Sequence, residues 1–256
     1  GNSGAFMMFE TSGGNGNLVS GLAQAAPTIL ANSLMGEVYK FLPNDTDMSV
    51  FKQAGVPAMN FAAIRGLSHY HTGLDRPDFL DRDTLQQEGD LLVALLAYFG
   101  NRQLDDLAGA DAVYFDLPGV GLIQYPLSWA LPAALGTGLL AGILVGWLRY
   151  RRQLRIRRMI AAGSFFLVSA LGLALLSQSL WYLLFILHPD YRSFAFGEPY
   201  NSHWYLLAFT LLSCALMLFG RRKAKRWINN NELLYGTLYC WWGLLVWVSA
   251  RIPGAS

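Results

Sequence analysis

The sequence has 256 residues, 54% of them hydrophobic, and a net charge of +2. The length allows one sizeable domain plus a second part, and the hydrophobic content predicts that this second part lies in a membrane. Residues 1–127 carry 6 Lys and Arg against 14 Asp and Glu, a balance of −8, whereas the remainder carries 13 against 3, a balance of +10. An acidic globular part followed by a basic, apolar part is typical of an ectodomain on a membrane anchor and argues against nucleic acid as a partner.

The first quarter of the chain alternates candidate strands and helices. Residues 6–10, FMMFE, form an apolar run that predicts a central strand. The TSGGNGN segment that follows predicts a turn rather than a phosphate cradle, because no GxxxxGK pattern is present. Residues 17–26 predict a short helix that Pro27 ends, and residues 33–42 fit a strand or a helix.

A further helix and strand are predicted downstream. Residues 47–54 predict a helix with Asp45 or Thr46 at its N-cap. Asn44 begins an N-x-T glycosylation acceptor in the same stretch, but this matters only in a eukaryotic secretory setting, so the cap is the favoured interpretation. Residues 56–64, VPAMNFAAI, predict a buried strand.

Residues 68–75, SHYHTGLD, are the stretch where metal-ligand chemistry, loop-forming residues and an acidic partner converge. Two of the four histidines, His69 and His71, lie here, and the Asp75 carboxylate follows His71 by four residues. A histidine on a loop that leaves a buried strand is where an α/β enzyme would place a reactive group. The alternative is a polar surface loop whose histidines have no function, because short histidine motifs often occur by chance.

The apolar periodicity is clearest in residues 83–99, which predict a helix that packs on the core. Asp83 or Thr84 is expected to cap its start and Gly100 to end it. The acidic RPDFLDRD segment before it predicts a solvated loop. One face of the helix is expected to hold Leu85, Leu92, Leu95, Leu96 and Phe99.

Residues 101–126 predict a connector. Its sequence is apolar and is broken by Pro118 and Pro126. We expect one extra strand followed by an interfacial segment, with Tyr114 and Tyr125 near lipid headgroups.

Four apolar spans follow, each long enough to cross a bilayer. The alternative is a soluble bundle of buried core helices, and the placement of charge argues against it, because Arg-rich segments separate the first two spans and the last two. The two cysteines, Cys214 and Cys240, lie in these spans and predict packing rather than a disulfide. The expected spans are residues 127–148, 159–187, 204–220 and 233–250.

The Arg-rich segments RYRRQLRIRR and RRKAKRW predict the orientation of the chain. By the positive-inside rule both are cytoplasmic, which places residues 1–126 outside the cytoplasm. Nucleic-acid binding by these arginines is the less favoured alternative. The loop between the middle spans carries His188 and His203 with Asp190 and Glu198, and we interpret these as polar loop residues in preference to a metal site.

Several sequence segments in the first half of the chain resemble one enzyme family. They are GNSGAFMMFETSGGN, PNDTDMSVFKQAGVPAMNFA, YHTGLDRPD and LQQEGDLLVALLAYF, in this order. They are similar to the C-terminal half of the catalytic domain of co-catalytic two-zinc aminopeptidases, in particular the membrane-embedded branch of vacuolar membrane proteases and endoplasmic reticulum metallopeptidases. The chain begins at Gly1 and stops soon after an apolar span, so we expect a piece of a longer protein, truncated at its N-terminus.

The resemblance implies a zinc-dependent exopeptidase of the aminopeptidase type that hydrolyses peptides with water activated by two zinc ions. It makes His71 a zinc ligand, with Asp47, Tyr70 and Asp75 as candidate residues around it. No catalytic residue of the family falls within the chain, because the general base and the other ligands are expected before Gly1. Glu10 is interpreted as structural.

The implied fold is α/β over residues 1–106, a partial zinc-peptidase domain with helices flanking a sheet. A connector at 107–126 and an all-α transmembrane bundle of about four helices at 127–256 complete it. The implied partners are peptide substrates and the lipid bilayer. The alternative is a non-catalytic peptidase-like ectodomain of a transporter or receptor-like membrane protein. The sequence leaves open the substrate, the membrane and the oligomeric state.

Overall fold

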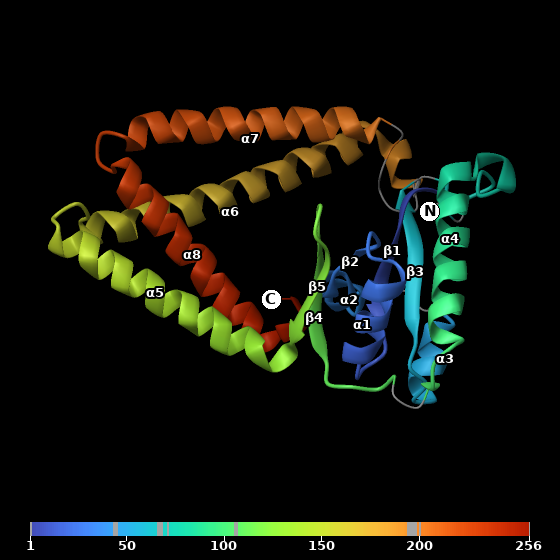
Figure 1. The fold of residues 1–256 in the computed structure, drawn as a ribbon. Helices are drawn as coiled ribbons and strands as arrows, with labels where there is room; N and C mark the ends of the chain where they lie inside the picture. Colours follow the sequence, from blue (N-terminus) through green and yellow to red (C-terminus); the bar gives the residue numbers. More distant parts are fainter. Residues whose placement is uncertain are drawn as a thin grey trace. The chain divides into compact units, whose positions relative to one another are not determined.

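The computed structural model describes residues 2–42, 46–65, 69–70, 72–104, 107–193, 199 and 201–255 (Figure 1). The chain divides into two compact units, each considered by itself. The first comprises Gly1–Ala133 together with Trp247–Ser256, and the second comprises Ala134–Val246.

The first unit is built on a three-stranded sheet in the order β2-β1-β3. Its central strand β1 (Ser3–Thr11) contains the predicted FMMFE strand, pairs in parallel with β2 (Leu30–Ala31) and runs antiparallel to β3 (Met59–Arg65). Strand β3 begins three residues later than predicted. Pro57 explains the delay, because it has no backbone N–H to donate to the ladder.

Helices α1 (Gly16–Ala25), α2 (Ser33–Tyr39) and α3 (Met48–Gln53) occupy the predicted segments. The ambiguous second segment is a helix because the Asn32 side chain accepts a hydrogen bond from Met35 N at 2.9 Å and so caps its first turn. Helix α3 starts one residue late, with Asp47 rather than Thr46 at the N-cap and no capping hydrogen bond from that side chain. Asn44 and Asp45 lie outside the described residues.

Helix α4 (Arg82–Phe99) confirms the long predicted helix, but its cap and its buried face differ from the prediction. Asp81 is the N-cap and accepts from Thr84 N at 2.9 Å, so Asp83 and Thr84 are not the caps. The Thr84 hydroxyl lies within hydrogen-bond distance of both Gly4 O of β1, at 2.9 Å, and Asp81 Oδ2, at 2.7 Å, which turns a polar residue inward. Thr84 and Leu91 are therefore buried, whereas three residues of the predicted face are exposed: Leu85 51%, Leu92 50% and Leu96 72%.

The core of this unit joins α1 and α4 to the sheet. Its members are fully or almost fully buried and come from α1, α4, β1, β2, the residue before β2 and β4 (Ala112–Leu117). They are Met8, Val19, Leu22, Ile29, Ala31, Leu91 and Tyr114.

The expected connector forms a β-hairpin of β4 (Ala112–Leu117) and β5 (Gly121–Pro126), not one strand and an interfacial segment. Gly119 and Gly121, with φ of +79° and +106°, adopt the left-handed backbone that its turn requires. Tyr114 was expected near lipid headgroups, but it is only 2% exposed. Its backbone exchanges two hydrogen bonds of 3.2 Å with the Ser33 hydroxyl, which fixes the hairpin to α2.

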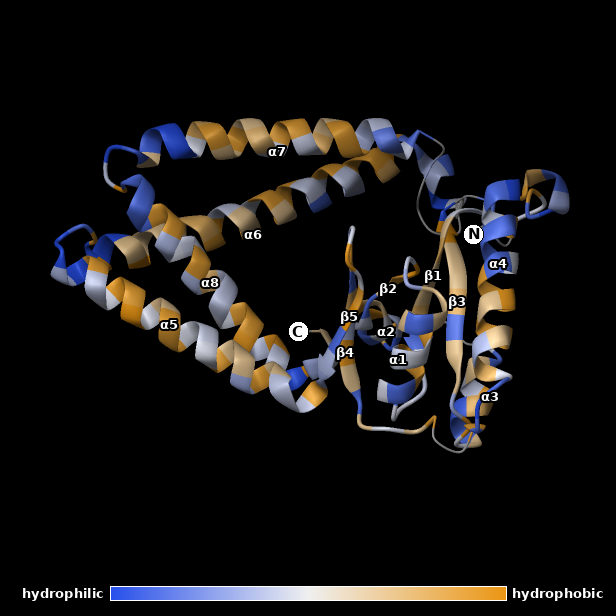
Figure 2. Cartoon of the chain, viewed as in Figure 1, coloured by the Kyte–Doolittle hydropathy of each residue, from blue (hydrophilic) through white to orange (hydrophobic). Residues whose placement is uncertain are grey.

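Four long helices follow, namely α5 (Ala130–Tyr150), α6 (Ile156–Leu187), α7 (Ser202–Ala224) and α8 (Asn230–Arg251). All four are long and apolar enough to cross a membrane, which agrees with the prediction of an all-α region of about four apolar helices. Figure 2 shows their apolar middles and the hydrophilic segments that join α5 to α6 and α7 to α8. Many of their apolar side chains are exposed, such as Leu206 at 69%, as expected for helices that a bilayer covers.

Within the second unit, α6 and α8 approach closely through glycines. A Cβ on Gly236 of α8 would lie 2.8 Å from Gly163 N of α6. The Cys240 thiol contacts Gly163 O at 3.7 Å, in agreement with the predicted packing role, whereas Cys214 is exposed on α7. Small residues thus set the closest approach of these two helices.

Candidate functional site

The candidate site lies at the sheet edge where β3 ends and β1 begins. The two strands are antiparallel, and Ser3 at the start of β1 pairs with Arg65 at the end of β3. The SHYHTGLD segment begins three residues after the end of β3 in the sequence. His71 and residues 66–68 lie outside the described residues, and the zinc-ligand assignment of His71 therefore stays a prediction.

The described part of the loop is fastened to the start of β1. The Asn2 side chain, only 7% exposed, has its Nδ2 2.9 Å from His69 Nδ1. This contact between the amide and the ring orients the His69 side chain. The His69 ring also packs edge-on against Phe79, with 5.2 Å between centroids. His69 thus has a structural role.

Turns shape the rest of the loop. The Thr72 hydroxyl donates to His69 O at 2.7 Å and accepts from Leu74 N at 3.2 Å, and Asp75 N donates to Thr72 O at 3.0 Å. Tyr70 and Asp75 are both exposed in this loop. These bonds hold the two candidate residues in one short segment on either side of His71.

Asp47 lies elsewhere. It is exposed at the start of α3 and follows Thr46, whose hydroxyl accepts from Asn60 Nδ2 at 3.0 Å. Asn60 lies near the start of β3, roughly 16 Å along the strand from Arg65. The structure therefore places Asp47 beside the opposite end of β3 from the His69 loop.

The start of α4 completes the edge. Asp81 N donates to Asn2 O at 3.0 Å, so the residue that holds His69 also holds the helix N-terminus. Hydrogen bonds from the Thr84 hydroxyl and backbone lower the pKa of the Asp81 carboxyl, so it is ionised at neutral pH. The strand, the loop and the helix are joined at Asn2.

A zinc ion needs several His, Cys, Asp or Glu ligands that lie close together. Within the described ranges, no three His, Cys, Asp or Glu side chains lie close enough together to hold a metal. His69 already uses Nδ1 for Asn2. The described residues therefore do not form a complete zinc site, and any such site needs His71 and ligands from outside them.

Two other groups of sequence candidates have structural contacts. Glu10, 8% exposed, accepts from Lys52 Nζ at 2.7 Å and from Asn60 Nδ2 at 3.1 Å, which joins β1 to α3 and β3 and agrees with its structural interpretation. In the second unit, His188 stacks on Tyr191 and His203 lies against Trp204. Glu198 is not among the described residues.

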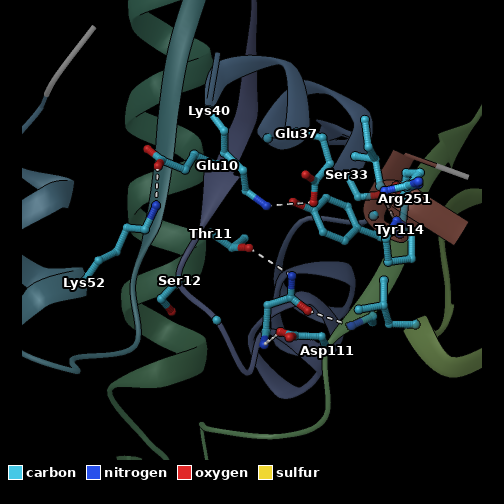
Figure 3. Close-up of a pocket in the computed structure, with 18 residues that line it drawn as sticks. Glu10, Thr11, Ser12, Ser33, Glu37, Lys40, Lys52, Asp111, Tyr114 and Arg251 are labelled. Carbon is cyan, nitrogen blue, oxygen red and sulfur yellow. Dashed lines mark hydrogen bonds and ion pairs between the residues drawn. The ribbon is translucent and has the colours of Figure 1, made fainter. Parts of the chain in front are cut away.

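Sequence reasoning missed a polar cavity of about 410 Å³ at the other end of β1. Its lining residues come from six separate regions of the chain, so no single sequence motif predicts it. Figure 3 shows Arg251 beside Tyr114, on the side away from the Glu10–Lys52 pair. Burial raises the pKa of the Tyr114 phenol, which therefore stays protonated. The labelled lining residues are Glu10, Thr11, Ser12, Ser33, Glu37, Lys40, Lys52, Asp111, Tyr114 and Arg251.

Comparison with known proteins places the first unit. Residues 1–96 match the model of Peptidase family M28. Endoplasmic reticulum metallopeptidase 1 of Homo sapiens is 31% identical over 129 residues, and that of Rattus norvegicus is 29% identical over 127 residues. Each match covers 47% of this chain and 14% of the relative. No solved structure matches the chain significantly.

The matched segment contains the sheet, the His69 loop and most of α4, and it precedes the four apolar helices. The mouse metallopeptidase, 30% identical over 129 residues, gives the same alignment length as the human protein. Residues 1–96 are therefore similar to a peptidase domain of family M28, and four candidate membrane-spanning helices follow them in the chain.

Proposed function

We propose that this chain is part of a membrane-anchored, zinc-dependent aminopeptidase. The observation that carries the proposal is the loop after β3, which Asn2 fastens to the start of β1 inside the segment that matches family M28. We further propose residues 1–106 as the peptidase-like region and 107–126 as the connector, with the transmembrane region at 127–256. The chain spans only 14% of its mammalian relatives, so the activity is proposed for the full-length protein.

In this proposal His71 is a ligand to one of two zinc ions, with Tyr70 and Asp75 beside it in the loop. Zinc would supply a polarised water for attack on a peptide carbonyl. The remaining ligands and the general base would come from outside the described residues. Asn2 and Thr72 act by holding the loop: the Asn2 amide fixes His69, and the Thr72 hydroxyl closes the turn onto His69 O.

The proposed setting is a membrane with the peptidase-like unit on the non-cytoplasmic side and both Arg-rich segments in the cytoplasm. Six basic residues in the 149–158 segment and five in the 221–227 segment support this orientation. Peptides would be the substrates, and nucleic acid has no part in the proposal.

Hydrolysis by the purified full-length protein tests the proposal. Leucine anilide should be cleaved, N-acetyl-leucine anilide should not, because an aminopeptidase requires the free amino group, and a chelator should abolish turnover. His71→Ala should remove most activity. His69→Ala in the same loop is the comparison variant and should be much milder, because it loses the loop contacts to Asn2 and Phe79 but no expected zinc ligand. Native turnover by His71→Ala would contradict the assignment, and equal cleavage of the acetylated substrate would contradict the aminopeptidase type.

A further inference from the structure

The polar cavity at the far end of β1 lies at the point where the chain enters and leaves its apolar spans. Leu127, the first residue of the first span, and Arg251, the last residue of the fourth, both line it. Pro253–Ala255 packs on α2 and β4, and Gly254 is buried so close to Glu37 that any Cβ would collide with that carboxylate. The cavity thus lies within the first unit, and its wall includes the first residue of the first span and the last residue of the fourth.

The aromatic residues near the start of the first span are of the types found at a bilayer surface. Trp129, two residues after the start of the first span, is 64% exposed, and Tyr125 precedes that span. Tryptophan and tyrosine are enriched where a bilayer meets water. The mouth of the cavity is therefore expected at the depth of lipid headgroups.

Two opposite charges that line the cavity have no ion-pair partner among the described residues. Glu10 is paired with Lys52 at 2.7 Å and Glu37 with Lys40 at 2.8 Å. Asp111 accepts from Gly14 N at 2.6 Å and Asn15 N at 3.3 Å and has no cationic partner among the described residues.

Arg251 is the complementary charge. No hydrogen bond or ion pair engages its guanidinium in the part of the chain that the structure describes. A cavity with one available cation and one available carboxylate suits a ligand that carries both charges.

We propose that this cavity binds the headgroup of a zwitterionic phospholipid of the phosphoethanolamine type. Arg251 would receive the phosphate, since the guanidinium fork matches phosphate oxygens in a bidentate manner. The primary ammonium would face Asp111, to which it can donate hydrogen bonds that a choline group cannot. The cavity volume of about 410 Å³ falls in the usual range of small-molecule sites. The proposal does not depend on the peptidase function.

Binding of short-chain lipids to the full-length protein in detergent tests this proposal. The probes are dihexanoyl phosphatidylethanolamine, the matching choline and glycerol lipids, and phosphoethanolamine without acyl chains. The ethanolamine lipid should bind tightest. Arg251→Gln should weaken both the ethanolamine and the glycerol lipid by about tenfold or more, because a charge-assisted hydrogen-bond pair is lost.

Asp111→Asn tests the ammonium contact independently of the phosphate contact. It retains an oxygen that can accept from Gly14 N, so the fold is preserved, and it should weaken the ethanolamine lipid while leaving the glycerol lipid unchanged. Arg222→Gln is the matched control, because Arg222 lies in the last turn of α7 as Arg251 does in α8. It should bind like the native protein.

Three results would overturn the proposal. Native lipid affinity of Arg251→Gln would show that Arg251 does not bind the phosphate. An equal effect of Asp111→Asn on both lipids would show that Asp111 does not bind the ammonium group. If phosphoethanolamine alone binds as tightly as the lipid, the occupant is a soluble zwitterion rather than a lipid.

Discussion

Gly236→Ala is expected to weaken the contact between α6 and α8. The added methyl would collide with Met159 O and lie 2.8 Å from Gly163 N and 3.1 Å from the Ala162 Cβ. Carbon atoms prefer separations of about 3.5–4.0 Å, so the helices must move apart by up to about 1 Å. Overpacking of this kind costs roughly 1–3 kcal/mol, and we expect a loss of that size in the free energy of unfolding.

The matched control is Gly243→Ala on the same helix, where an added Cβ has nothing within 4 Å among the described residues. That change should be neutral or should stabilise the helix by up to about 1 kcal/mol, because alanine has the higher helix propensity. Thermal unfolding of both variants in the same detergent is the assay. Equal midpoints for the two variants, or native stability of Gly236→Ala, would refute the close approach of α6 and α8.

Two further predictions concern the core and the topology. Leu22→Ala should destabilise the first unit by about 2–5 kcal/mol in urea unfolding, because Leu22 is fully buried, whereas Leu96→Ala, at a residue 72% exposed, should change it by less than about 1 kcal/mol; equal losses would contradict the described core. In a cysteine-free background, an impermeant thiol reagent applied to intact cells should label Ser193→Cys but not Gln153→Cys, because the Arg-rich segment is expected inside. Labelling at position 153 from outside would overturn the orientation.

The elements with direct local signals could be predicted from the sequence. The four spans follow from the length of their apolar runs, and the strands and helices before them from apolar runs, caps and turn residues. The buried face of α4 could not be predicted, because the Thr84–Gly4 hydrogen bond joins residues 80 positions apart and turns Leu96 outward. Tyr114 was misplaced for a similar reason, since its burial depends on Ser33 and the α1 core rather than on neighbouring residues.

The candidate site divides in the same way. The YHTGLD motif carries enough chemistry to draw attention to His71, but the contact between Asn2 and His69 spans 67 positions and leaves no pattern in the sequence. The cavity was even less predictable from the sequence. Arg251 ends an apolar run and resembles any other flanking basic residue, and only the fold, in which Pro253–Ala255 packs on α2 and β4, makes it line the same cavity as Asp111.

Metal content of the full-length protein tests the central claim most directly. If His71 is a ligand in a two-zinc peptidase site, the native protein should contain two zinc ions per chain. His71→Ala should then lose most of the zinc from one of the two sites while its unfolding transition is unchanged, and His69→Ala should retain nearly all of it. Native zinc content in folded His71→Ala, measured by mass spectrometry of the purified protein, would contradict the assignment of His71 as a zinc ligand.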